Sequence, residues 1–141
     1  MIQDKNLLKQ LRVKLIMPDI EMINPGIPVA GPYNPGIKAG NLLFISGQGS
    51  AQSEEDIEDQ TLTTLNKLKT IVEAGGGKIL NIVNTTVFLK NIKDFSKMNG
   101  VYKKFFNDNS VLKSYPSRAT VAVSNLPLPS MLVEISAIAV L

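Results

Sequence analysis

The residues best suited to chemistry in this sequence are a glutamate and an arginine in its last third. Glu134 lies within LVEISAIAV (132–140), a short apolar run that predicts a β-strand. Because side chains alternate along a strand, Glu134 shares one face with Ser136 and Ile138. A carboxylate among apolar neighbours needs a cationic partner, a hydrogen-bond network or a role as a proton carrier. A solvated strand rim or a structural ion pair is the commoner explanation for a single strand carboxylate.

Arg118 is the natural partner or companion for that carboxylate. It follows Pro116 at the start of a predicted strand and shares a face with the small residues Thr120 and Ala122. Small neighbours leave room beside a guanidinium, whose planar fork suits bidentate binding of a carboxylate or phosphate. Pairing with an acidic neighbour for structural reasons is the alternative, and these residues alone do not separate the two interpretations.

Tyr33 belongs to a proline-rich loop. The segment NPGIPVAGPYNP (24–35) holds four prolines, so it predicts an extended, fixed loop that can form a pocket wall. Tyr33 either closes that pocket or packs locally with its hydroxyl in water.

A glycine triplet at 75–77 follows a predicted helix. No Gly-Lys-Ser/Thr sequence comes after it, which indicates a helix end and not a phosphate loop.

Composition restricts the chemistry further. The chain has neither histidine nor cysteine, which excludes Ser-His-Asp and Cys-His catalysis, disulfides and cysteine metal clusters, and we expect no metal site. Fifteen Lys and Arg against twelve Asp and Glu give a net charge of +3, spread along the chain, so nucleic acid is not the expected partner. No apolar run reaches the roughly 20 residues of a membrane span, and we expect a cytoplasmic protein without a membrane partner.

The elements that position these residues follow from periodicity. We expect a strand at 41–47, a helix capped by Ser53 and ended by Gly75, a strand at 82–89, and a second helix capped by Asp94. Strands at 117–125 and 131–140 are separated by a proline turn of a length that suits a hairpin or near neighbours. The order β, α, β, α, β, β predicts an α+β fold with two helices on one face of a mixed sheet.

Residues 1–20 are predicted to form an N-terminal extension to a single domain at 21–141. Its leucines at 7, 8, 11 and 15 have helical spacing, and Lys5, Lys9 and Arg12 lie on another face. We expect an ordered extension that packs on the domain or on a neighbouring subunit. A mitochondrial transit peptide is the alternative, disfavoured by the acidic Asp4 and the lack of serine.

Four segments in order resemble the RidA/YjgF family, also called the L-PSP endoribonuclease family. They are GPYNPGIKAGNLLFISGQ (31–48), VNTTVFLKNIKDFSKMNGVYKKFF (83–106), YPSRATVAV (115–123) and LVEISAIAV (132–140). The similarity runs from about Asn24 to the C-terminus. It implies a chorismate-mutase-like α+β fold assembled as a homotrimer, with three sites in the clefts between subunits.

The resemblance also implies an activity, that of a 2-iminobutanoate/2-iminopropanoate deaminase-like hydrolase. Such enzymes convert 2-aminoacrylate and 2-iminopropanoate-type compounds to 2-keto acids and ammonia without metal or cofactor. By the same resemblance, Arg118 binds the substrate carboxylate and Glu134 holds and polarises the attacking water. The family's pocket-lining positions are occupied here by Tyr33, Ser46, Gly47 and Asn99, and Thr120 stands where relatives often have cysteine.

Departures from the family pattern border the expected cleft and leave the substrate range open. Asn34-Pro35-Gly36 replaces the usual glutamine-containing stretch, the loop after Gln48 is short, and the turn LPLPSM (126–131) is one residue longer than usual. Two other functions remain as alternatives. One is a trimeric small-molecule-binding protein without turnover, and the other is an endoribonuclease or translation inhibitor, which the dispersed +3 charge disfavours.

Overall fold

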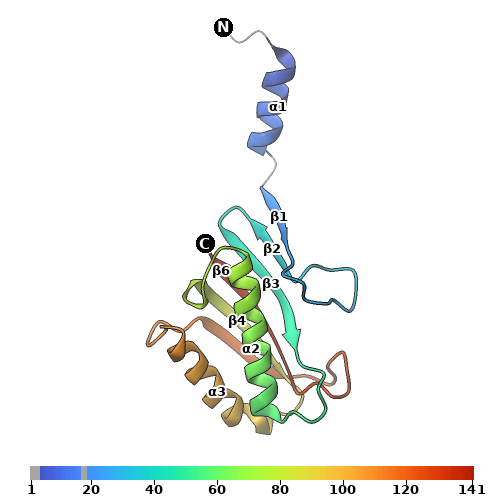
Figure 1. Ribbon diagram of the computed structural model, residues 1–141, viewed down its shortest axis with the longest axis vertical. Helices are drawn as coiled ribbons and strands as arrows, with labels where there is room; N and C mark the ends of the chain where they lie inside the picture. Colours follow the sequence, from blue (N-terminus) through green and yellow to red (C-terminus); the bar gives the residue numbers. More distant parts are fainter. Residues whose placement is uncertain (1–3, 17–18) are drawn as a thin grey trace.

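The computed structural model describes residues 4–16 and 19–141, which fold into a six-stranded sheet with two helices on one face (Figure 1). The strands are β1 (Ile20–Ile23), β2 (Gly36–Ala39), β3 (Leu42–Gly49), β4 (Ile82–Leu89), β5 (Ser117–Ala122) and β6 (Val133–Val140). The helices are α1 (Lys5–Ile16), α2 (Ile57–Ala74) and α3 (Phe95–Asp108), with short 3-10 turns η1 (Ile79–Asn81) and η2 (Ile92–Asp94). The predicted α+β fold with a mixed sheet is confirmed.

The strand order is β1-β2-β3-β6-β4-β5, and only the β4–β5 pair is parallel. Of the two arrangements expected for the last two strands, the hairpin is excluded, and they are near neighbours with β4 between them. β6 inserts between β3 and β4, while β5 lies at the sheet edge and ends at Ala122, short of the predicted residue 125. β1 and β2 were not predicted, because strands of four residues offer too little periodicity to be recognised.

Helix α2 begins later than the sequence indicated. Asp56 is its N-cap, and the Asp56 carboxylate accepts a hydrogen bond of 2.9 Å from the Asp59 backbone N–H. Ser53, the predicted cap, lies in the turn before the helix, because several adjacent residues are suitable caps and only the path of the loop selects one. The predicted end at Gly75 is confirmed.

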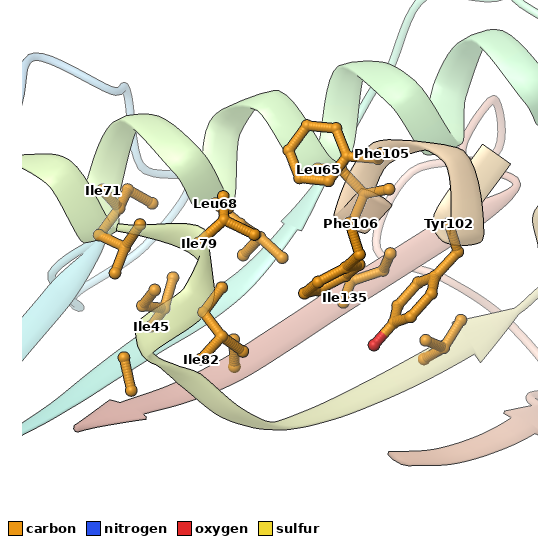
Figure 2. Close-up of a cluster of buried hydrophobic side chains, with 14 of the residues drawn as sticks. Ile45, Leu65, Leu68, Ile71, Ile79, Ile82, Tyr102, Phe105, Phe106 and Ile135 are labelled. Atoms are coloured by element: carbon orange, nitrogen blue, oxygen red, sulfur yellow. The ribbon is translucent and has the colours of Figure 1, made fainter. Parts of the chain in front are cut away.

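The core lies between the sheet and helices α2 and α3. Figure 2 shows Leu65, Leu68 and Ile71 of α2 directed toward the sheet, beside Phe106 of α3 and Ile135 of β6. These five side chains are fully buried, and each contributes roughly 1.5–3 kcal/mol by leaving water. The core thereby fixes α3 against the sheet, next to the edge strand β5.

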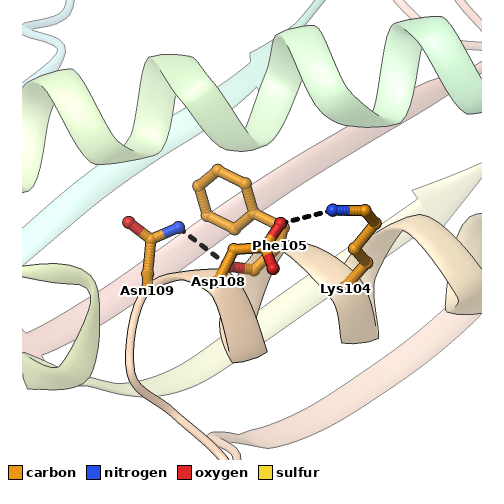
Figure 3. Close-up of polar contacts among 4 residues, drawn as sticks. All are labelled: Lys104, Phe105, Asp108 and Asn109. Carbon is orange, nitrogen blue, oxygen red and sulfur yellow. Dashed lines mark hydrogen bonds and ion pairs between the residues drawn. The ribbon is translucent and has the colours of Figure 1, made fainter.

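The C-terminal end of α3 is stabilised by two local contacts (Figure 3). The Lys104 ammonium lies 2.6 Å from the Asp108 carboxylate, and the Asn109 amide donates a 2.8 Å hydrogen bond to the Phe105 carbonyl. The chain then turns back toward β5. Tyr115 on this return segment donates a 2.6 Å hydrogen bond to the Asn107 side-chain oxygen, which keeps the segment beside α3.

Helix α1 stands clear of the sheet and of the other helices (Figure 1). The Asp4 carboxylate caps it by accepting hydrogen bonds of 2.8 Å and 3.2 Å from the Asn6 and Leu7 backbone N–H groups. Leu8 and Leu11 are exposed, so the expected packing of the extension on its own domain is not found. Its packing on a neighbouring subunit stays a prediction, and the side chain of Leu15 lies outside the described residues. No helix in the described ranges is long and apolar enough to cross a bilayer.

The sheet face opposite α2 and α3 carries no helix (Figure 1). Strand register places a row of apolar side chains on this open face, with exposed fractions of 36–70%: Ile20, Met22, Leu42, Phe44 and Val140. Contiguous exposed apolar surface of this kind marks an interaction site in a folded protein.

Candidate active site in two halves

One half of the site lies at the sheet edge, around Arg118 on β5. Its Nη2 donates a 2.6 Å hydrogen bond to the Asn99 side-chain oxygen on α3. The guanidinium carbon lies 4.7 Å from the centre of the Tyr102 ring and 5.8 Å from that of Phe95. Among the described residues, no carboxylate forms a salt bridge with Arg118. Its positive charge is therefore not neutralised within this part of the chain.

A cavity of about 360 Å³ opens beside this arginine. Its walls are formed by α3 and by the segment that leads into β5: Asn99, Tyr102, Lys103, Tyr115, Pro116 and Arg118. The wall carries two cations and no acid. A cavity of this size and charge suits a small anion, and the guanidinium fork suits a carboxylate in particular.

The second half of the site surrounds Glu134 on β6. The β3–β6 ladder shifts register between Ile45 and Gln48, and Gly47, within this irregularity, lies beside Glu134. A Cβ atom at Gly47 would lie 2.6 Å from Glu134 Oε2, so the absence of a side chain makes space for the carboxylate.

Burial raises the pKa of the Glu134 carboxyl above its ordinary value of 4.5. No cation in the described ranges lies within salt-bridge distance of it. A carboxylate with a raised pKa and without a bound cation is a better proton acceptor than one held in an ion pair. Glu134 therefore has the electrostatic setting of a general base.

The proline-rich loop is attached to this second half. The Ser46 hydroxyl donates a 2.6 Å hydrogen bond to the Asn34 carbonyl, and the Ser46 backbone N–H donates to the Pro35 carbonyl at 2.9 Å. Tyr33 adjoins this anchor, is half exposed, and accepts a 3.3 Å hydrogen bond at its hydroxyl from the Ala30 N–H. Ser46 thus positions the loop, next in sequence to the glycine that borders Glu134.

The two halves lie on opposite faces of the sheet. Arg118 pairs with Thr85 across β5 and β4, and the Thr85 hydroxyl contacts Tyr102 of α3, so both point to the helix side. Glu134 pairs with Phe88, three residues along β4 from Thr85, and therefore points to the open side. Arg118 and Glu134 are therefore not partners within one chain, and their expected association across a cleft between subunits stays a prediction. The physical reason is that β4 lies between β5 and β6, and that Arg118 and Glu134 pair with β4 residues whose side chains point to opposite faces.

The remaining predicted residues divide between the halves. Asn99 lies with Arg118 and Gly47 lies with Glu134, while Ser46, next to Gly47, anchors the loop that carries Tyr33. Thr120 follows Arg118 on the helix side of β5, and its buried hydroxyl has no hydrogen-bond partner among the described residues. The described residues include no group of three or more acidic side chains that could hold a metal ion.

Comparison with known proteins places this chain among its relatives. The family model of endoribonuclease L-PSP matches residues 25–141. A RutC family protein of Pyrococcus horikoshii is 44% identical over 115 residues, which cover 77% of this chain and 86% of the relative. The 2-iminobutanoate/2-iminopropanoate deaminase of Escherichia coli is 38% identical over 115 residues, covering 78% and 88%. The chain belongs to the RidA/YjgF family.

Solved structures agree with this membership in RidA/YjgF. The E. coli TdcF structure with bound serine has a TM-score of 0.80 at 34% identity, covering 86% of this chain and 98% of that one. The E. coli YjgF gene product has a TM-score of 0.78 at 36% identity, covering 85% and 98%. The family resemblance inferred from the motifs is therefore confirmed, and the matched region begins after α1 and β1.

Several residues of this RidA/YjgF site were missed by sequence reasoning. Tyr102 and Thr85 were not identified there as site residues. Lys103 and Tyr115 line the Arg118 cavity. The spacing of three between Asn99 and Tyr102 on a helix places both over one neighbour, which is the one signal that could have found them.

Proposed function

We propose that this RidA/YjgF protein hydrolyses small 2-imino acids, and the enamines that tautomerise to them, to 2-keto acids and ammonia. The observation that carries the proposal is the half-buried guanidinium of Arg118 on edge strand β5. It is held by Asn99, has no acid partner in the described chain, and lies at a cavity sized for a small molecule. The name of the E. coli relatives that share 38% identity supports the same reaction. The family's other name, endoribonuclease, has no matching feature in the cavity, whose wall offers two tyrosines but no extended basic groove.

In this proposal Arg118 binds the substrate carboxylate and so places C2 of the imine at a fixed distance. Glu134 accepts a proton from a water molecule as the water oxygen bonds to C2 and the C=N electron pair moves to nitrogen. Proton return from Glu134 to that nitrogen gives a carbinolamine, with a hydroxyl and an amino group on C2. Glu134 then accepts the hydroxyl proton and passes it to the amino nitrogen, so that the C–N bond breaks with its electron pair leaving on ammonia while the oxygen forms the C2 carbonyl. The products are ammonia and a C2 carbonyl, so one water is consumed and no redox equivalent is needed.

The opposite faces of the sheet require two copies of the chain for this chemistry. One copy supplies Arg118 from its edge, and a second copy supplies Glu134 from its open face. The exposed apolar row on the open face, which includes Phe44 and Met22, supports burial of that face in an oligomer. We propose a homotrimer, since a head-to-tail contact repeated three times closes into a ring with three equivalent sites.

The direct test adds the protein to a serine or threonine dehydratase reaction and follows keto-acid release against spontaneous hydrolysis. We expect acceleration by the wild-type chain and none by Arg118→Ala or Glu134→Gln. If the wild type does not accelerate release but binds 2-ketobutyrate in an Arg118-dependent manner by calorimetry, the protein is a binding module and hydrolysis is excluded.

A mixing experiment tests whether the two halves come from different copies. Arg118→Ala and Glu134→Gln are each inactive as pure proteins, but co-refolded in equal amounts they form mixed oligomers. A site is intact when a Glu134→Gln chain supplies the arginine and an Arg118→Ala chain supplies the glutamate, which holds for about a quarter of sites after random mixing. Recovery of about a quarter of wild-type activity supports the two-copy site, and absence of any recovery contradicts it.

A further inference from the structure

We propose that the Tyr102–Thr85 pair is a positioning device that holds the Arg118 guanidinium ready for a carboxylate without neutralising its charge. The role of this pair in catalysis rests on the proposed function. The orientation and order of the Arg118 side chain can be measured without turnover.

The Tyr102 ring lies under the guanidinium and leaves its hydrogen-bonding fork open. The 4.7 Å separation between the Arg118 guanidinium carbon and the ring centre is within the range of a cation–π contact, which uses the face of the cation and none of its N–H groups. In the described part of the chain, the guanidinium has one side-chain acceptor, the Asn99 oxygen on Nη2. The remaining donors stay available for a bidentate ligand.

Thr85 fixes the ring in that place. The hydroxyl oxygens of Tyr102 and Thr85 lie 2.8 Å apart in a buried hydrogen bond. Thr85 is also the residue of β4 that pairs directly with Arg118 on β5. The ring of Tyr102 is therefore tied to the strand next to the arginine that it supports, and Phe106 packs against it at 4.6 Å between ring centres.

An aromatic support has a consequence that an acidic one would not have. A carboxylate beside Arg118 would hold the side chain equally well but would compete with the substrate carboxylate for the same fork. Burial raises the pKa of the Tyr102 phenol above its ordinary value, so the phenol stays protonated and neutral at physiological pH. Arg118 is thus ordered while its charge remains available for a ligand.

The test uses three variants and one control. Tyr102→Leu removes the aromatic face, Tyr102→Phe keeps the face but loses the hydroxyl, and Thr85→Val removes the partner hydroxyl. Phe105→Leu is the matched control, because Phe105 is also a buried aromatic of α3 but forms no cation–π contact with Arg118. Thermal unfolding of all four shows which variants remain folded at the assay temperature.

The first readout is the side-chain order of Arg118, measured by NMR relaxation of its Nε–H group without substrate. The chain contains only two arginines, Arg12 and Arg118, so an Arg12→Lys background leaves a single signal to follow. We expect an ordered Arg118 in the wild type, in Tyr102→Phe and in Phe105→Leu, and a mobile one in Tyr102→Leu. An Arg118 that is equally ordered in Tyr102→Leu overturns the inference, whatever the protein's activity.

The second readout is ligand affinity. We expect Tyr102→Leu to raise the Kd for 2-ketobutyrate and the KM for the imine about tenfold, with a smaller change in kcat. Tyr102→Phe and Thr85→Val should raise both about two- to fourfold, and Phe105→Leu should leave both unchanged despite its lower stability. Equal losses of affinity in Tyr102→Leu and in the control would assign Tyr102 to general packing and overturn the positioning role. If the wild type neither binds nor turns over these compounds, the proposed function fails while the order of Arg118 still decides this inference.

Discussion

Gly47 leaves free the space that the Glu134 carboxylate occupies, since a Cβ atom there would meet Oε2 at 2.6 Å and the carboxyl carbon at 2.8 Å. The glycine lies at the register shift between β3 and β6, where the backbone approaches the glutamate from the neighbouring strand. A side chain at this position cannot coexist with the present rotamer of Glu134. The glutamate would have to turn away, because it is the flexible member of the contact.

Gly47→Ala is therefore expected to lower kcat about tenfold or more while leaving thermal stability nearly unchanged, because a shift of about 1 Å in a reacting group is costly to the rate. Imine hydrolysis and thermal unfolding measure the two effects. Gly100→Ala is the control, since a Cβ there meets nothing within 4 Å and the change favours helix α3 by about 0.5–1 kcal/mol. Wild-type kcat in Gly47→Ala would contradict the placement of Glu134 in the reaction.

The raised pKa of Glu134 predicts the pH dependence of activity. The base must be ionised, so kcat/KM should fall as the pH drops through a value above the ordinary 4.5 of a glutamate. Glu134→Gln should lower the rate roughly 10²- to 10⁴-fold and abolish this acid limb. A pH profile that keeps the same limb in Glu134→Gln would assign the limb to another group.

The same raised pKa, which favours proton transfer, is predicted to lower the stability of the fold at neutral pH. A carboxyl whose pKa is raised in the folded state destabilises the fold once the pH exceeds its unfolded-state pKa, and the penalty is complete above the folded-state pKa. Glu134→Gln should therefore have an equal or higher Tm than the wild type at pH 7, and the difference should shrink toward pH 4. Calorimetric scans across this range test it, and a lower Tm for the variant at pH 7 only would oppose the assignment.

Gln60 on α2 is a buried polar residue that joins the two loops flanking the Glu134 half-site. Its amide donates hydrogen bonds to the carbonyls of Gln52 at 3.3 Å and Ser130 at 2.9 Å, and its oxygen accepts one of 2.8 Å from the Leu132 N–H. Gln60→Leu leaves these backbone groups without partners, so we expect a loss of about 2–4 kcal/mol in the free energy of unfolding. Asn66→Leu, a similar change at an exposed position of the same helix, should cost under about 0.5 kcal/mol.

Phe44 lies on the open face of the sheet and is 44% exposed in the single chain. If that face is buried between copies, Phe44→Glu places a charge in an apolar interface, and we expect the oligomer to dissociate and hydrolysis to be lost. Light scattering after gel filtration measures the mass. Leu62→Glu, at an exposed position on α2 with an exposed fraction of 47%, should change neither mass nor activity. A Phe44→Glu protein with unchanged mass would exclude this face as the interface.

Much of the local structure could be predicted because its causes are local. Gly75 predicted the end of α2, and the strand at 82–89 was predicted with its observed bounds. The short strands β1 and β2 could not be found, since their hydrogen-bond partners are distant in sequence and four residues carry little pattern. The choice of Asp56 over Ser53 as the cap also depended on the path of the loop.

The sequence by itself identified Arg118 and Glu134 as candidate site residues and determined which neighbours share their face within each strand. Alternation placed Glu134 with Ser136 and Ile138, and Arg118 with Thr120, as the structure has them. Only the tertiary structure decided that the two faces are opposite ones. Alternation decides only which residues of a single strand share a face. Which residues of two different strands share a face depends on strand pairing, here on the insertion of β6 between β3 and β4 and the place of β5 beyond β4. That pairing depends on contacts between distant segments, and it places Arg118 and Glu134 on opposite faces of the sheet within one chain.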